Sequence, residues 1–271
     1  MSQTIFEKES VLAASAEEAF VWHARPGAIE RLSPPWDPLT VICRTGGIRP
    51  GAEVVMRLAA GPFPYTWHAR HTEYEENRLF RDEQVRGPFA RWTHTHAFEP
   101  RGPDQCRLRD TIRFAAPLAG LTGPLADPII RRQLARIFAF RHRLTAADLV
   151  LHRQFRDQPR QTVLVSGAGG LIGSRLVPFL TTGGHRVVRL VRRQPQSDEE
   201  IFWDPAAGRI DSEKLEAARP DAVIHLAGEN VGQGRWTPTR QQEIIDSREK
   251  GTTLIAAALA GDRKSTRLNS S

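Results

Sequence analysis

A glycine-rich turn that directly follows a short apolar segment constrains this chain more than any other feature. Residues 163–166 are predicted to form a strand, and Gly167, Gly170 and Gly173 follow at intervals of three. An apolar helical pattern then begins at Leu171. Glycines let the chain turn sharply and let a pyrophosphate approach the backbone, while a helix N-terminus offers unpaired N–H groups to phosphate. The order of strand, glycine turn and helix therefore predicts a dinucleotide-binding loop, with an ordinary strand-to-helix turn as the alternative.

A second strand is predicted at residues 186–191, and it ends at Arg192 and Arg193. In dinucleotide folds an acidic residue at this point binds the 2′-hydroxyl of NAD, whereas a basic residue accommodates the 2′-phosphate of NADP. The first acidic residue after the strand is Asp198, so NADP is favoured over NAD. The alternative is that Arg192 is a solvated surface charge. The predicted cofactor-binding residues of this region are Gly167, Ala168, Gly169, Gly170, Leu171, Ile172, Gly173, Arg192 and Arg193.

A third strand is predicted at residues 221–226, and it runs into Ala227 and Gly228. Small residues at the carboxyl end of a strand let the chain pass beneath a cofactor. We therefore add Leu226, Ala227 and Gly228 to the predicted cofactor site. His225 lies within the apolar run and is interpreted as a core residue rather than a catalytic base.

Together these residues resemble the short-chain dehydrogenase/reductase superfamily of the NAD-dependent epimerase/dehydratase type. Residues 166–173 follow its Thr-Gly-x-x-Gly-x-x-Gly pattern with serine in the first place, and Gly-Thr-Thr-Leu at 251–254 matches a later helix. Trp-Asp-Pro at 203–205 and Arg-Trp-Thr at 235–237 resemble one epimerase-like subfamily. The resemblance covers about residues 160–261 and implies a Rossmann domain that binds a nicotinamide nucleotide.

The resemblance also implies a Tyr-x-x-x-Lys pair in which the tyrosine acts as general acid and base. The only tyrosines of this sequence, Tyr65 and Tyr74, precede the glycine motif. Arg248 stands where the extended enzymes commonly carry asparagine. We therefore expect a chain truncated at its C-terminal end, with about half of a Rossmann domain and no turnover. Residues 262–271 are polar, have no apolar period and are expected to be a non-native tail.

The first 152 residues form a separate predicted domain. Ser15 and Glu18 form a capping box before a short helix, residues 26–32 form a second helical segment, and residues 124–151 form one long helix with an apolar stripe. Glycine and proline pairs separate the predicted strands. These strands are residues 4–12, 39–45, 53–59, 65–74, 79–86, 90–98 and 106–114.

A curved antiparallel sheet that wraps a long C-terminal helix is the helix-grip architecture. By this order of elements the region resembles the START-like superfamily, which includes polyketide cyclases and coenzyme-Q-binding proteins, over most of residues 3–151. The resemblance implies a cavity between sheet and helix that holds a small apolar ligand. The candidate lining residues, chosen by the face of the strand on which they lie, are Trp67, Trp92, His94, His96 and Phe98.

His94 and His96 share one face of a strand, as a pair of metal ligands would. No third ligand follows at a supporting spacing, so we predict no metal site and interpret both histidines as structural or solvated. An arginine set on the long helix is interpreted as a solvated outer face rather than a surface for a membrane or a partner. It consists of Arg131, Arg132, Arg136, Arg141 and Arg143.

Charge and composition exclude several classes of protein. The net charge is +7, from 38 basic and 31 acidic residues, but neither half concentrates it, so no nucleic-acid partner is predicted. Two cysteines cannot form a disulfide framework and fit a reducing compartment. The N-terminus has no apolar signal core, and no apolar run reaches membrane-spanning length. We expect a soluble, cytoplasmic protein without a membrane partner.

The predicted fold class is an α+β helix-grip domain (1–152), a linker (153–161) and an incomplete α/β Rossmann domain with a doubly wound parallel sheet (162–261). One candidate function is an NADP-dependent epimerase or oxidoreductase, in its full-length form, whose N-terminal domain holds a small apolar substrate. A second is a non-catalytic module that senses NADP and binds a lipid or isoprenoid. A third, an interaction protein linked to cell division, has no supporting residue. A homodimer of the full-length protein also stays open.

Overall fold

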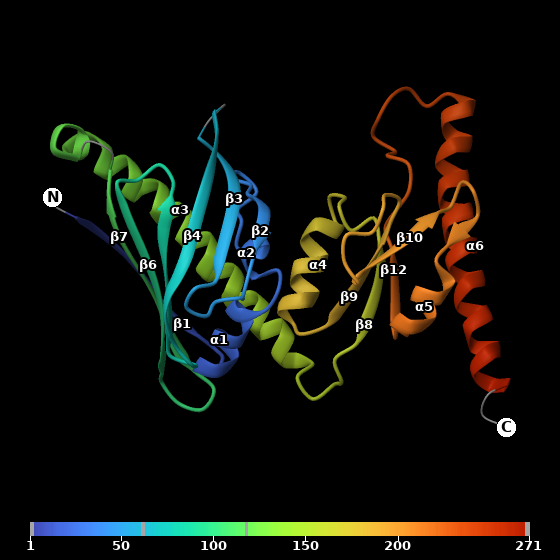
Figure 1. Cartoon of the computed structure of the whole chain (residues 1–271), viewed down its shortest axis with the longest axis horizontal. Coiled ribbons are helices and arrows are strands. Elements are labelled where there is room, and N and C mark those ends of the chain that lie inside the picture. The colour runs from blue at the N-terminus through green and yellow to red at the C-terminus, as the bar shows by residue number, and fades with distance from the viewer. Residues whose placement is uncertain (1–2, 61–62, 117–118, 269–271) are drawn as a thin grey trace. The chain divides into compact units, whose positions relative to one another are not determined.

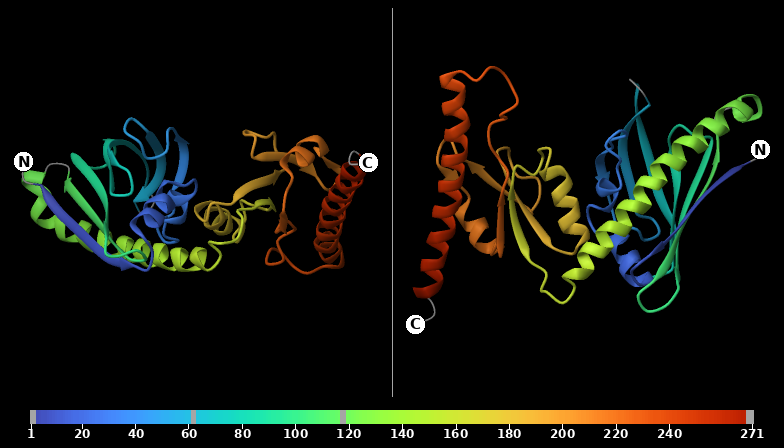
Figure 2. Two further views of the ribbon diagram at one scale, coloured as in Figure 1. Left: turned by 90° about the horizontal axis from the view of Figure 1, so that it is seen from below. Right: turned by 180° about the vertical axis from the view of Figure 1, so that it is seen from behind.

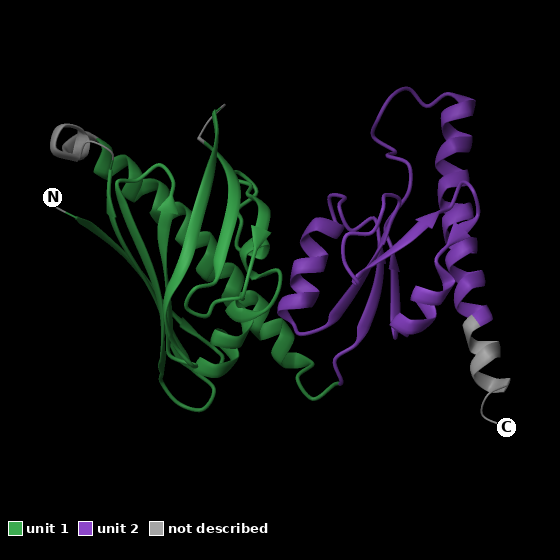
Figure 3. Cartoon of the chain, in the orientation of Figure 1, with its two compact units in different colours: residues 1–158 green, residues 159–271 purple. Residues whose placement is uncertain are grey.

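The computed structural model describes residues 3–60, 63–116 and 119–268 (Figure 1, and from two further sides in Figure 2). The side chains of residues 60, 119–125 and 262–268 lie outside this description. The chain forms two compact units, residues 1–158 and residues 159–271 (Figure 3). The division falls within the segment that the sequence analysis interprets as a linker.

Unit 1 is built on a seven-stranded antiparallel sheet, and all seven strands are where the sequence predicts them. In β6, Trp92, His94, His96 and Phe98 are buried and alternate with less buried residues, which confirms the predicted face. In order across the sheet, the strands are β1 (Thr4–Leu12), β7 (Cys106–Ala115), β6 (Arg91–Pro100), β5 (Leu79–Arg86), β4 (Phe63–Glu75), β3 (Glu53–Ala60) and β2 (Thr40–Arg44).

The helices of unit 1 are α1 (Ala16–Ala24), α2 (Ala28–Arg31) and α3 (Ala119–Gln154). The capping box before α1 is confirmed. The Ser15 hydroxyl accepts a hydrogen bond from the Glu18 N–H at 3.1 Å, and the Glu18 carboxylate accepts one from the Ser15 N–H at 2.8 Å. These two bonds pair N–H groups that the first turn of a helix leaves without partners.

Helix α3 lies along the sheet, which curves around it (Figure 2). Its Leu134 and Phe138 pack with residues of β1 and β7, among them Phe6 and Ile112. Burial of each such side chain contributes roughly 1.5–3 kcal/mol. This stripe fixes α3 as the second layer of a helix-grip fold.

The outer face of α3 carries most of the arginine set. Arg131, Arg132, Arg136 and Arg143 are exposed, as expected. For Arg141 the prediction is wrong: it is only half-exposed, its guanidinium carbon lies 5.0 Å from the ring centre of Phe138, and it lines an internal cavity. Arg141 follows Leu134 by seven residues and Phe138 by three, so helix geometry places it on the inner face with the apolar stripe rather than on the outer face.

Unit 2 contains a five-stranded sheet, and four of its strands run parallel. The chain runs outward from β8 through β9 to β10 and then returns to the other side of β8 in β12. This is the strand order of an incomplete Rossmann-type domain. Across the sheet, the strands are β11 (Arg209–Ile210), β10 (Glu200–Asp204), β9 (Arg186–Val191), β8 (Thr162–Ser166) and β12 (Ala222–His225).

Helices cover both faces of this sheet (Figure 1). Helix α4 (Gly173–Thr182) packs on one face, and α5 (Ser212–Ala218) and α6 (Pro238–Leu268) pack on the other. Helix α6 includes residues 262–268 of the segment expected to be a non-native tail, and residues 269–271 of that segment lie outside the described residues. None of the described helices combines the length and the apolar character needed to cross a bilayer.

The sequence analysis missed β10 and β11. The apolar run Ile201–Trp203, between polar residues, is the signal that could have revealed β10. The strand predicted at 221–226 is therefore the fourth parallel strand by chain order, not the third. Glu200 opens β10 with a carboxylate that is 3% exposed, and Arg193 donates two hydrogen bonds to it at 2.8 and 2.6 Å.

Replacement of Arg193 by alanine is expected to lower the urea midpoint of unit 2, because it removes two donors and leaves the buried Glu200 carboxylate with the Gln196 N–H and the more distant Arg189. Hydrogen bonding from Arg193 lowers the pKa of Glu200. The ionised Glu200 carboxylate therefore stabilises unit 2 fully at a pH above the usual glutamate pKa. This stabilisation is lost as the pH falls through the lowered pKa of Glu200 in the folded protein. Urea unfolding at pH 7 and at pH 4 measures both effects. An unchanged midpoint at pH 7 would contradict the assignment.

Candidate functional site

The glycine turn between β8 and α4 is held tight by backbone contacts that leave no room for side chains. Gly167 has a φ of +69°, a conformation that favours glycine. A Cβ atom on Gly173 would lie 2.3 Å from the Gly167 carbonyl oxygen and 2.7 Å from the Cα of Ala168. The first and last glycines of the motif are therefore required by the backbone path itself.

The turn also presents unpaired donors. The backbone N–H groups of Gly169, Leu171 and Ile172 have no hydrogen-bond partner within the described part of the chain. Leu171 is 91% exposed and Ile172 is 63% exposed, so the predicted helix begins two residues too early and α4 starts only at Gly173. A loop with free N–H groups at a helix N-terminus is suited to bind phosphate.

The end of β12 lies directly against this turn. A Cβ atom on Gly167 would lie 2.7 Å from the backbone nitrogen of Ala227 and 2.8 Å from the carbonyl carbon of Leu226. The buried Ser166 hydroxyl accepts hydrogen bonds from the N–H groups of Leu226 and Ala227, at 3.1 and 3.2 Å. Ser166 is a positioning residue that the sequence analysis did not single out.

Gly228 and His225 lie beside α6. The guanidinium carbon of Arg248 would be 3.2 Å from a Cβ atom on Gly228, and Arg248 donates a hydrogen bond to the Glu229 carbonyl at 3.3 Å. Arg248 therefore supports the backbone that follows β12. His225 is half-buried, and its Nδ1 lies 2.5 Å from the Ser166 hydroxyl oxygen, which agrees with a structural role.

The two adjacent arginines at the end of β9 have different surroundings. Arg193 is held by Glu200, as described above. Arg192 is exposed, and no ion pair or hydrogen bond of its side chain occurs among the described residues. Of the two predicted cofactor contacts, Arg192 is the one that is free to meet a phosphate at this strand end.

Unit 1 encloses a cavity of about 870 Å³ between the sheet and α3. Its volume lies within the usual range of small-molecule sites. Apolar side chains from β3, β4 and α3 form much of the wall, including Met56, Leu134 and Ile137. Trp67 and Trp92 also line it, with ring centres 5.0 Å apart, and so do His94 and His96.

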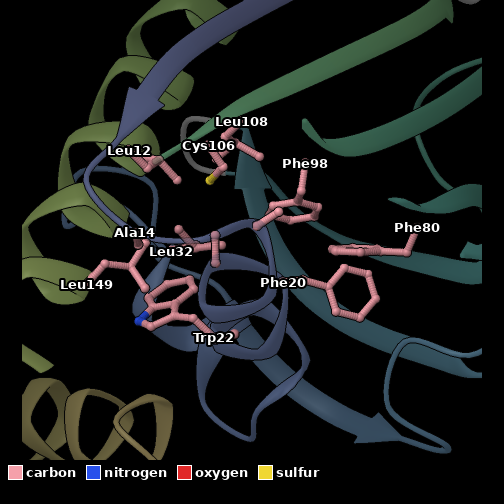
Figure 4. Packing of buried hydrophobic residues seen from close by; sticks show 13 residues of the cluster. Leu12, Ala14, Phe20, Trp22, Leu32, Phe80, Phe98, Cys106, Leu108 and Leu149 are labelled. Atoms are coloured by element: carbon pink, nitrogen blue, oxygen red, sulfur yellow. The ribbon is translucent and has the colours of Figure 1, made fainter. Parts of the chain in front are cut away.

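Phe98, the fifth residue predicted to line the cavity, does not lie on its wall. It is 1% exposed and belongs to a packed cluster at the α1 end of the sheet. Figure 4 shows its ring beside those of Phe20 and Phe80, with ring centres 5.5 and 6.1 Å away. Phe98 shares the face of β6 with the histidines, but α1 covers that end of the face.

A polar cluster at one end of the cavity centres on Asp110 of β7. Its carboxylate is 3% exposed and accepts hydrogen bonds from His94 Nε2 at 3.0 Å and His142 Nε2 at 2.6 Å. His96 Nδ1 lies 2.6 Å from the same carboxylate, outside hydrogen-bond geometry. Burial alone would raise the pKa of Asp110, but the surrounding histidines hold it well below the usual value. A carboxylate in this setting accepts hydrogen bonds, so the His94 and His142 Nε2 atoms that bond to it act as donors.

Asp82 of β5 joins this cluster from the other side. Its Oδ2 lies 3.5 Å from His94 Nδ1, and ligand atoms of Asp82, His94 and His96 all lie within 4.8 Å of one another. Burial raises the pKa of Asp82, against the opposing effect of His71 and Arg141. The sequence analysis missed Asp82, Asp110 and His142 because strand register, not spacing along the chain, brings them to the histidines.

In the comparison with known proteins, a different family model matches each unit. Residues 163–270 match the model of the NAD dependent epimerase/dehydratase family. Residues 12–138 match the model described as polyketide cyclase / dehydrase and lipid transport. A crystal structure of a nucleoside-diphosphate sugar epimerase from Corynebacterium glutamicum superposes with a TM-score of 0.72 at 26% identity, covering 94% of this chain and 52% of that one.

The matches to curated relatives cover about two fifths of this chain or less. An epimerase family protein of Mycobacterium leprae is 38% identical over 112 residues, which is 41% of this chain and 36% of the relative. Epimerase family protein SDR39U1 of Homo sapiens is 41% identical over 100 residues, 36% of this chain and 31% of the relative. The chain thus spans about a third of the length of the curated relatives it matches.

The fold and the glycine turn define a START-like, helix-grip domain joined to an incomplete Rossmann-type domain that binds a nicotinamide nucleotide. The matches to family models define the two domains more narrowly than the fold does. The chain carries a polyketide cyclase-type domain at residues 12–138 and an NAD dependent epimerase-type domain at residues 163–270.

Proposed function

We propose that unit 2 binds the adenosine-pyrophosphate part of NADP and that the protein to which this chain belongs is an NADP-dependent epimerase or oxidoreductase. The observation that carries this is the glycine turn, with its unpaired N–H groups at the N-terminus of α4. These groups and Gly167 would hold the pyrophosphate. Arg192, exposed and without a partner in the described residues, would meet the 2′-phosphate. Bound NADP supplies hydride chemistry, and this chain contributes binding rather than turnover.

Unit 1 is proposed to hold a small, mainly apolar molecule with one polar end. The cavity of about 870 Å³ has an aromatic and aliphatic wall, and its polar residues gather around Asp82 and Asp110. Such a pocket orients a ligand by its few polar groups while the apolar wall supplies affinity. The ligand would be the substrate or a carried precursor of it.

The second candidate function is a module that senses NADP and binds a lipid or isoprenoid without chemistry. Arg248 favours it, because it supports the backbone after β12 at a position where extended enzymes of the superfamily commonly carry asparagine. A test for hydride transfer from NADPH to a carbonyl compound by the full-length protein distinguishes the enzyme from the non-catalytic module. Only the enzyme is expected to show it.

The cofactor assignment is tested by replacing Arg192 with alanine. We expect wild-type protein to bind 2′,5′-ADP more tightly than 5′-ADP, and the variant to lose about tenfold or more of that preference, since a charge-assisted contact contributes about 1.5–3 kcal/mol. Isothermal titration measures both ligands. The Arg193→Ala variant is the matched control, in which the preference should persist although the fold is less stable. Equal affinity of the wild type for both ligands would overturn the choice of NADP.

A further inference from the structure

We infer that Asp82, His94 and His96 form a binding site for one divalent transition-metal ion at the polar end of the cavity in unit 1. One ligand atom from each residue lies within 4.8 Å of the others. Two imidazoles and a carboxylate on one side of a metal, with the remaining positions open, are the donor set of many zinc and non-haem iron sites. This goes beyond the proposed function, which assigns no metal to the protein.

Strand register builds the site. Asp82 of β5 is paired with His94 of β6, and His96 lies two residues further along the same face of β6. The three side chains therefore project from adjacent positions of one sheet face toward the cavity, which all three line. Rigid strands hold ligands more closely in place than loops do.

Asp110 orients both histidines from behind. It accepts from His94 Nε2 at 3.0 Å, and its oxygen lies 2.6 Å from His96 Nδ1. A carboxylate accepts but cannot donate, so His94 Nε2 carries the hydrogen of this bond, and Nδ1 of the neutral His94 ring has a free lone pair. Metal-binding histidines usually show this arrangement, with a carboxylate fixing the tautomer. His142 and its 2.6 Å bond hold Asp110 in turn.

The pair Asp82 and His94 shows why a cation fits here. With Nε2 committed to Asp110, the His94 atom that faces Asp82 is Nδ1, at 3.5 Å from Oδ2. A lone pair and a carboxylate oxygen repel each other at this distance unless a proton or a metal ion lies between them, and a metal ion can bind His96 as well. Two donors that each bind a metal at about 2.0–2.1 Å are separated by roughly 3.0–3.5 Å, so the pair is already spaced for one ion.

The site takes a cation of intermediate softness, such as Zn²⁺, Fe²⁺ or Co²⁺, since imidazole is a poor ligand for Mg²⁺ and Ca²⁺. Its open positions face the cavity and would accept an oxygen atom of the molecule bound there. The metal test needs neither a nucleotide nor an apolar ligand, so its failure would leave the proposed function standing.

The experiment is a titration of the tag-free chain with Co²⁺ after treatment with EDTA, followed by visible absorption, and then displacement by Zn²⁺. We expect one Co²⁺ per chain and a weakening by about 100-fold or more in Asp82→Asn, which removes a direct ligand. His71→Gln is the matched control, because His71 lines the same cavity opposite Asp82 but lies outside the ligand group. Its loss of affinity should be about tenfold smaller than that of Asp82→Asn, or less, because His71 is a neighbour of Asp82 and supplies no ligand atom.

His96→Gln is the second variant, and unfolding in EDTA shows whether each variant is folded. Cys43→Ser removes the exposed thiol as a competing Co²⁺ ligand and should leave the titration unchanged. Absence of saturable binding to the folded wild-type chain would overturn the inference. Equal affinity in wild type and folded Asp82→Asn or His96→Gln would overturn it as well, since the ion would then be bound elsewhere.

Discussion

Binding of 2′,5′-ADP is expected to fall by about 30-fold or more when Gly173 is replaced by alanine. The added Cβ would lie 2.3 Å from the Gly167 carbonyl oxygen and within 2.8 Å of two backbone atoms of Ala168. Backbone atoms cannot move aside as the end of a side chain can, so the turn must open. Overpacking of this kind costs about 1–3 kcal/mol, and 2 kcal/mol spent on deforming the site corresponds to about 30-fold in affinity.

Gly169→Ala is the matched control for this variant. A Cβ on Gly169 would meet no heavy atom within 4 Å, and the φ of Gly169 is not among the positive values. The same methyl group placed four residues earlier should therefore leave both the melting temperature and the affinity for 2′,5′-ADP nearly unchanged. Gly173→Ala protein that binds as tightly as wild type would show that the turn is not the phosphate site.

Replacement of Asp110 by asparagine is expected to destabilise unit 1 by about 3–5 kcal/mol, the usual cost of removing one partner from a buried ionic group. The carboxylate accepts from His94 and His142 and is 3% exposed. An amide of the same shape has one oxygen, and its NH₂ group would face a ring N–H. At least one buried donor would then lose its acceptor. Urea unfolding in EDTA measures the loss without any contribution from metal.

The effect of Asp110→Asn has a defined pH dependence. The surrounding histidines hold the pKa of Asp110 well below its usual value, so its stabilising contribution is fully present above the unfolded value of about 3.9. As the pH falls further, through the lowered folded value, wild type loses this contribution and the two proteins converge. A difference that disappears already at pH 6 would contradict this account.

Asp104→Asn is the matched control for the Asp110 variant. Asp104 also pairs with a basic residue, Arg153, but its side chain is 64% exposed. Water replaces the partner of an exposed carboxylate, so the same substitution should change the unfolding free energy by less than about 0.5 kcal/mol. A loss as large as that of Asp110→Asn would show that burial is not the cause.

Sequence patterns predicted the secondary structure of unit 1 because its signals are local. The alternation in β6, the capping box at Ser15 and the apolar stripe of α3 each depend on residues a few positions apart. In unit 2 the short strand β10 was missed, since five residues with a charged first member give little periodicity. Glu200 is buried there with Arg193, Arg189 and the Gln196 N–H as partners of its carboxylate.

The polar cluster of unit 1 could not be predicted in the same way. Spacing along the chain placed His94 and His96 on one face, but Asp82 and Asp110 lie on the two neighbouring strands and His142 on α3. Their meeting depends on the register of β5, β6 and β7, which a shift of one residue would destroy. Phe98 lies on the predicted face of β6, but alternation along a strand does not show that α1 covers this end of the face.

By itself the sequence determined the glycine turn, because the requirement for glycine at 167 and 173 is a property of a few consecutive backbone dihedrals and contacts. It also determined the two-unit organisation, through the change from strand-rich to alternating strand and helix patterns. Only the tertiary structure decided that Arg193 is committed to Glu200 while Arg192 is free, and that Asp82 completes a histidine pair. The contact of Arg193 with Glu200 and that of Asp82 with the histidines each join two neighbouring strands. The distance between such residues depends on how the strands pair, which their spacing along the chain does not reveal.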